Sequence, residues 1–176
     1  KEGFSTWATP MILAQFEPNG GHQLDAFIKN FGTMGTDSLA STRAIRQPIL
    51  KNENIRNAYD SITYSKSQAV IHMIDSYFGS KMFRQALGKY IEEYADGVAD
   101  SPQFYQSIAK QTGEPQLTKT FEHFVEQKGV PLMGVTLSCE KNKQTTLKLT
   151  QTRYKPLGSS IDNANQWNVP MCVKFK

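Results

Sequence analysis

The sequence predicts an α+β chain, with a mainly helical part in residues 1–129 followed by a β part in residues 130–176. Up to Gly129 apolar residues recur at helical spacing, and from Val130 onward they alternate with polar residues among β-branched residues and turn formers. The 176 residues are 39% hydrophobic and 20% charged, which is enough for one real core and a second small one. We therefore expect two structural units that meet near Gly129.

Two helices are expected first, in residues 5–16 and 21–34. Pro18, Gly20 and Gly21 end the first of them. The second is predicted from apolar residues at helical spacing: Leu24, Phe27, Ile28 and Phe31. Residues 36–59 show no clear period and contain Pro48, so they predict a long loop that is either functional or packed on a larger neighbour.

The strongest helical pattern covers residues 61–78. Asp60 or Ser61 can cap this helix, and Gly79 ends it. Its apolar residues form one broad face: Ile62, Ala69, Val70, Met73, Ile74 and Tyr77. Further helices are expected at 81–94, 101–113 and 115–128, with Ser101 as the cap of the second of these and Pro102 in its first turn.

Three strands are expected in the β part, in the segments MGVTLSCE (133–140), QTTLKLTQTRY (144–154) and WNVPMCVKFK (167–176). KNK and PLGSS mark the turns between them. Three short strands bury too little surface for an independent sandwich, so we expect an incomplete sheet with an unpaired edge, packed against the helical part. Cys139 and Cys172 lie on the first and last of these strands, as two half-buried thiols or as a disulfide.

The charge pattern and the motifs that are lacking exclude several classes of protein. The formal net charge of +4 comes from residues spread along the chain without a run of about five like charges, which disfavours a nucleic-acid partner. No apolar stretch approaches the roughly 18–20 residues that span a bilayer. A Gly-x-Ser-x-Gly or Cys-His signature is also lacking, so covalent hydrolysis has little support.

Four segments carry a resemblance to a known family. They are Glu-Gly-Phe at residues 2–4, YDSITYSKSQAVIHMI at 59–74, FRQALGKYIEEYA at 83–95 and FEHFVEQKGVPLMGV at 121–135. In this order they resemble the M1 family of zinc aminopeptidases, gluzincins with a thermolysin-like catalytic domain. The resemblance implies that residues 1–129 are part of the helical C-terminal lobe of that domain, and that residues 130–176 begin the β-sandwich domain that follows it.

The resemblance also implies roles for two residues. Glu2 matches the glutamate that completes the zinc site after a His-Glu-x-x-His motif, although Lys1 stands where the family usually has Asn. Tyr64 matches the tyrosine of a Tyr-x-Lys-Gly pattern, in which Lys66 fits and Ser67 replaces the glycine. By this resemblance the Tyr64 hydroxyl is catalytic and donates to the oxyanion. Without the resemblance, Glu2 would be interpreted as a solvated terminal carboxylate and Tyr64 as an aromatic residue of the core.

Lys66 itself is expected to face solvent or a carboxylate partner. The histidines of the chain, His22, His72 and His123, lie too far apart in sequence to form the two-histidine face of a zinc-binding helix. The chain is therefore expected to begin after the His-Glu-x-x-His motif and to be inactive by itself. Two histidine ligands of its zinc would come from the upstream part of its parent chain.

As implied by the resemblance, the parent enzyme hydrolyses the N-terminal peptide bond of peptides with a free N-terminus through zinc-activated water. The alternative is a non-catalytic M1-like pseudo-enzyme or protein-interaction scaffold, and an unrelated helical binding module ranks last. The cysteine pair and the bacterial character of the β part favour a periplasmic or otherwise exported protein over a cytoplasmic one.

Overall fold

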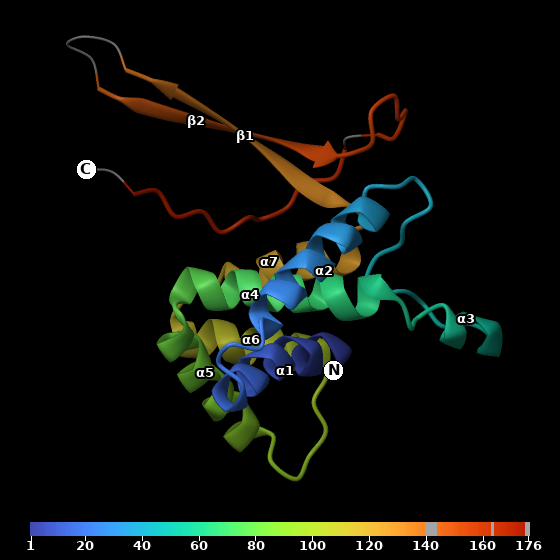
Figure 1. Ribbon diagram of the computed structural model, residues 1–176, viewed down its shortest axis with the longest axis vertical. Helices are drawn as coiled ribbons and strands as arrows, with labels where there is room; N and C mark the ends of the chain where they lie inside the picture. Colours follow the sequence, from blue (N-terminus) through green and yellow to red (C-terminus); the bar gives the residue numbers. More distant parts are fainter. Residues whose placement is uncertain (140–143, 163, 175–176) are drawn as a thin grey trace.

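A computed structural model of the chain describes residues 1–139, 144–162 and 164–174. The fold is α+β, as predicted, with a group of helices from which a two-stranded hairpin projects (Figure 1). The elements, in order, are α1 (Glu2–Phe16), α2 (His22–Asp37), α3 (Asn52–Arg56), the π-helix η1 (Ile62–Lys66), α4 (Ser67–Phe78), α5 (Ser80–Glu93), α6 (Ser101–Thr112), α7 (Leu117–Glu126), β1 (Val130–Ser138) and β2 (Thr146–Tyr154).

The residue that caps α6 differs from the one predicted. Asp100, not Ser101, is the cap: its Oδ1 accepts from Gln103 N at 2.8 Å, while Gln103 Oε1 accepts from Asp100 N at 2.7 Å. This reciprocal capping box makes Ser101 the first helical residue. The helix ends at Gly113, as predicted, and Gly113 adopts the left-handed conformation.

Two further differences concern the central part of the chain. The expected loop at 36–59 contains the short helix α3. The expected single helix at 61–78 is divided into a π-helical turn, η1, and the α-helix α4. A π turn holds an extra residue compared with an α turn, and such turns occur frequently at functional sites.

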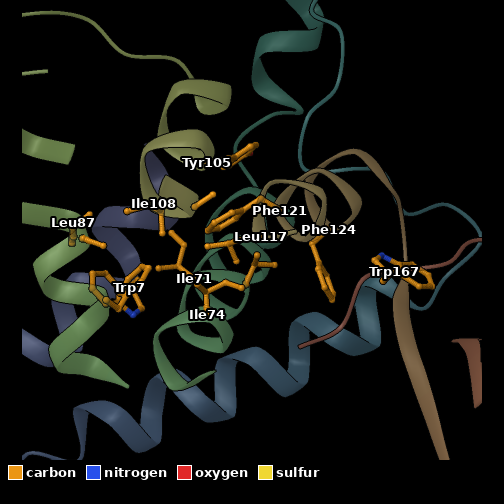
Figure 2. Packing of buried hydrophobic residues seen from close by; sticks show 14 residues of the cluster. Trp7, Ile71, Ile74, Leu87, Tyr105, Ile108, Leu117, Phe121, Phe124 and Trp167 are labelled. Atoms are coloured by element: carbon orange, nitrogen blue, oxygen red, sulfur yellow. The ribbon is translucent and has the colours of Figure 1, made fainter. Parts of the chain in front are cut away.

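The core of the helical part lies between α1, α4, α5, α6 and α7 (Figure 2). Phe83, Ile74 and Ile108 are completely buried in it. Aromatic rings contribute much of the contact: Phe121 stacks on Tyr105 with 4.7 Å between ring centroids, and Trp7 meets Phe83 edge-on at 5.4 Å. This core fixes the relative positions of the helices that carry the candidate site.

The apolar residues that predicted α2 do not enter this core. Leu24, Phe27, Ile28 and Phe31 are each more than half exposed, and the rings of Phe27 and Phe31 meet edge-on at 4.8 Å. The buried positions of α2 are instead polar, Thr33 and Asp37. The helical spacing was therefore a correct signal for the helix, while its apolar face lies at the surface.

The hairpin pairs β1 and β2 antiparallel, with Val130 opposite Tyr154 and Ser138 opposite Thr146. Within the described residues each strand pairs only with the other, so the sheet has the unpaired edges that were expected. The PLGSS turn is present, since Ser159 N donates to Pro156 O at 3.1 Å, and the KNK turn lies outside the described residues.

The third predicted strand is wrong for residues 167–174, and residues 175–176 lie outside the described part. The backbone of this segment bonds to side chains instead of a neighbouring strand. Trp167 N donates to Gln151 Oε1 at 2.6 Å, Gln151 Nε2 donates to Trp167 O at 2.9 Å, and Asn168 N donates to His123 Nδ1 at 3.1 Å. The segment thus lies along α7, where Trp167 joins the core (Figure 2).

Cys139 and Cys172 are free, so the structure shows separate thiols and no disulfide, but both are exposed and the expected half-burial is wrong. The helices end at Glu126 and the strands begin at Val130, and the division into domains 1–129 and 130–176 stays a prediction. None of the described helices combines the length and the apolar character needed to cross a membrane.

Candidate active site

The start of α1 lies directly against the start of α4. Gly3 is buried, and a Cβ atom added to it would overlap with the Cβ of Ser67. Only a residue without a side chain allows this approach of the two backbones. The glycine of the Glu-Gly pair therefore brings Glu2 next to the π-helix that carries Tyr64.

Glu2 lines a cavity of about 680 Å³, a volume typical of small-molecule sites. The Glu2 side chain is 25% exposed, and its ion-pair partner among the described residues is Lys1, with 3.8 Å between Nζ and Oε1. The cavity extends from α1 to the loop before η1 and to the helices behind it. Its apolar lining includes Ile49, Ile55, Ile71, Phe104 and Phe121.

Tyr64 is half-buried in η1. Partial burial raises the pKa of its hydroxyl, with smaller contributions in the same direction from the Glu2 carboxylate and from Tyr59. The hydroxyl is therefore protonated at neutral pH and can donate a hydrogen bond. The packing of α1 on η1, with Gly3 against Ser67, places the two candidate residues in the same region despite their separation in the sequence.

If Glu2 and Tyr64 belong to one site, both should border one gap, and the structure reproduces this in part. Glu2 lines the cavity together with Thr63, which precedes Tyr64, and Ser67, three residues after it, whereas Tyr64 is not among the lining residues. The structure brings Glu2 and Tyr64 to the same corner of the molecule, and their roles as metal ligand and catalytic residue stay predictions.

The amino-terminal end of η1 is held by Asp60. Its Oδ1 accepts from Ile62 N at 2.9 Å and from Thr63 N at 3.1 Å, so Asp60 is the one of the two predicted caps whose side chain bonds the helix. Arg43 strengthens this end, because its Nη2 lies 2.6 Å from Asp60 Oδ1 and 2.7 Å from Thr63 Oγ1. These bonds fix the turn that precedes Tyr64.

The carboxyl-terminal end of η1 is held by a buried ion pair. Lys66 is 6% exposed, and its Nζ lies 2.8 Å from Asp37 Oδ2 and donates to Gln127 O at 3.1 Å and Gly129 O at 3.2 Å. Burial lowers the pKa of Lys66, and the Asp37 carboxylate opposes this shift. Asp37 Oδ1 accepts from Thr42 and from Gly129 N, both at 2.9 Å.

Of the two environments expected for Lys66, the carboxylate partner is therefore correct. The sequence did not identify that partner as Asp37, because the two residues lie on separate helices with no spacing pattern between them.

The three histidines lie apart from one another and have different surroundings. His22 lies 3.1 Å from Glu17, His72 is exposed, and His123 accepts from Asn168 N. Within residues 1–139, 144–162 and 164–174, no three His, Cys, Asp or Glu side chains gather in a way that could hold a metal ion. The open carboxylate of Glu2 fits a single zinc ligand, while a complete zinc site needs ligands from outside the described residues.

Comparison with known proteins identifies the family. The family model described as the Peptidase family M1 domain matches residues 1–127. The chain belongs to the M1 peptidase family. The matched region contains Glu2, Tyr64 and Lys66, and it ends just before β1.

Several known proteins match nearly the whole chain. Aminopeptidase M1-A of Oryza sativa subsp. japonica is 30% identical over 173 residues, which are 98% of this chain and 19% of the relative. Tricorn protease-interacting factor F2 of Thermoplasma volcanium is 26% identical over 177 residues, 99% of this chain and 22% of the relative. Aminopeptidase M1 of Arabidopsis thaliana is 27% identical over 172 residues, which are 98% of this chain and 19% of the relative. The chain thus spans about a fifth of the length of these relatives.

Proposed function

We propose that this chain is part of a zinc-dependent aminopeptidase, which hydrolyses the N-terminal peptide bond of peptides with a free N-terminus. The observation that carries the proposal is the packing of the start of α1, with Glu2, against η1, with Tyr64, beside a cavity of about 680 Å³ in a chain of the M1 peptidase family. These are the two residues that match the zinc-ligand and active-site tyrosine positions of that family.

Glu2 is proposed as one of three protein ligands of the zinc ion. Its carboxylate is suited to this role because its ion-pair partner among the described residues is only the exposed Lys1, at 3.8 Å. When bound, zinc makes a water molecule acidic and polarises the scissile carbonyl. The histidines of this chain do not form a ligand pair, so the other ligands would come from outside it, and the isolated chain is proposed to be inactive.

Tyr64 is proposed to donate a hydrogen bond to the oxyanion that develops on the scissile carbonyl. The pKa of its hydroxyl is raised above the ordinary value, so the hydroxyl is protonated at neutral pH and can serve as this donor. A donor of this kind contributes about 3–4 kcal/mol to transition-state stabilisation in comparable sites. The largely apolar cavity beside Glu2 would receive part of the peptide.

The test uses a complete enzyme that carries this segment. Tyr64→Phe is expected to lower kcat by about a hundredfold or more, with KM and zinc content near those of the wild type, because the hydroxyl acts on the transition state. Tyr77→Phe is the control, since Tyr77 is an exposed tyrosine of α4. An unchanged kcat in Tyr64→Phe would make Tyr64 a structural residue.

Glu2 requires a different measurement. Glu2→Gln removes the charge of the proposed ligand and should lower the zinc content of the purified enzyme, as determined by metal analysis after dialysis. Full zinc occupancy in this variant would show that Glu2 is not a zinc ligand.

A non-catalytic M1-like scaffold is the second candidate function. The exposed apolar side of α2, with Leu24, Phe27, Ile28 and Phe31, favours it because exposed apolar patches often mark interaction sites. A complete protein that is folded but fails to hydrolyse aminoacyl substrates with zinc present would select this candidate.

A further inference from the structure

We propose that Lys66, together with Asp37, is a positioning residue for Tyr64. The buried ion pair anchors the carboxyl-terminal end of the π-helix η1, two residues beyond Tyr64, and so sets the direction of the tyrosine side chain. The inference rests on the proposed function in one respect, namely that Tyr64 is the group whose position matters.

Two hydrogen bonds and one ion pair restrain the Lys66 side chain. An ammonium group has three donor hydrogens, and Nζ lies within 3.2 Å of three acceptors, Asp37 Oδ2 and the carbonyls of Gln127 and Gly129. With 6% of the residue exposed, water cannot replace any of these partners. Displacing Nζ would leave a buried charge without its hydrogen bonds, which is strongly unfavourable.

The π turn needs such an anchor because it competes with the regular α-helix that follows. An α-helix rotates by about 100° per residue, so relaxation of the π turn to an α turn would rotate Tyr64 relative to α4. Asp60 and Arg43 hold the amino-terminal end of η1, and Lys66 holds its other end. With both ends fixed, the turn cannot relax without breaking hydrogen bonds, and those at the Lys66 end are buried.

Such anchoring matters for catalysis because hydrogen-bond donors must be held within about 0.5 Å of the productive position.

The residues that hold Lys66 also contact the base of the hairpin. The Gly129 carbonyl accepts from Lys66, and the Gly129 amide donates to Asp37. Arg153 of β2 packs on Gly129 and donates to Leu39 O at 3.2 Å. The backbone at the junction with the β part therefore helps to hold Tyr64.

A double-mutant cycle in the complete, zinc-loaded enzyme tests the proposal. Lys66→Met should lower kcat by about tenfold or more, with KM and zinc content near wild-type values. In the Tyr64→Phe background, the same substitution should lower kcat by less than about twofold, because the group that it positions is already gone. A purely structural role would reduce kcat by the same factor in both backgrounds.

Asp37→Asn gives a second, milder cycle, since the amide oxygen can still accept from Gly129 N while the charge beside Lys66 is lost. It replaces Lys66→Met if that variant does not fold. Lys89→Met is the matched control, because Lys89 is exposed on α5 and its ion-pair partner among the described residues is the exposed Glu92.

Equal kcat losses in both backgrounds, or no loss in folded Lys66→Met or Asp37→Asn enzyme, would overturn the positioning role. A Tyr64→Phe single variant with unchanged kcat would overturn the proposed function of Tyr64 and the positioning role with it. Because that result is read from the single variant alone, the two failures are distinguishable.

Discussion

The helical part and the hairpin are held in opposite ways. Phe83, Ile74 and Ile108 are completely buried between helices, whereas in β1 and β2 the only buried residue is Arg153. Leu137, near the end of the hairpin, is 62% exposed. The helical part is stabilised by apolar burial, and a two-stranded hairpin of this kind has little apolar burial to stabilise it alone.

The hairpin is attached to the helices at its base, and mainly by polar groups. Arg153 donates to Leu39 O, and Gly129, just before β1, bonds to both Lys66 and Asp37. This difference indicates that the helical part depends on shape and packing, while the placement of the hairpin depends on a few buried hydrogen bonds.

The largest effect on stability is expected for Phe121→Ala in the helical core. Phe121 is 1% exposed and stacks on Tyr105 with 4.7 Å between centroids, so its truncation leaves a cavity. The free energy of unfolding should fall by about 3–5 kcal/mol, as measured by urea denaturation. A loss below about 1 kcal/mol would mean that apolar packing is not what holds the helices together.

An intermediate effect is expected at the junction. Gly129 has φ of 97°, and an added Cβ would overlap with the side chain of Arg153. Gly129→Ala should therefore reduce the free energy of unfolding by about 1–3 kcal/mol.

Gly88→Ala is the matched control for that substitution, because Gly88 lies within α5 and a Cβ there meets nothing within 4 Å. It should raise the free energy of unfolding by about 0.4–1 kcal/mol. If both alanine variants were equally stable, the junction would tolerate movement and would not fix the hairpin.

The smallest effect is expected near the end of the hairpin. Leu137→Ala removes an exposed side chain opposite Leu147, and the free energy of unfolding should change by no more than about 0.5 kcal/mol. Thermal unfolding of wild type and variant in parallel is sufficient to detect a difference. A loss above about 1 kcal/mol would show that this face is covered in solution.

The sequence by itself determined the α+β class and most of the helices. Local signals were sufficient because a helix makes its backbone bonds within one segment, as in α4, where Gly79 ends an apolar pattern. The Glu-Gly-Phe and ITYSKS segments likewise indicated the family that the match over residues 1–127 shows.

A strand, in contrast, needs a partner that no local pattern specifies. Residues 167–174 alternate as a strand does, yet their backbone bonds to the side chains of Gln151 and His123, and Trp167 packs into the core. Which segment pairs with which depends on the space that the helices leave, and only the tertiary structure decides this.

The candidate site shows the same division. Glu2 and Tyr64 could be selected as candidates from the sequence. Their closeness depends on Gly3, because its lack of a side chain lets α1 approach Ser67. The π turn and the Lys66–Asp37 pair had no sequence signal, because they are formed by contacts between distant segments around a buried charge. Local spacing predicts which residues share a helix face, and tertiary packing decides which faces meet.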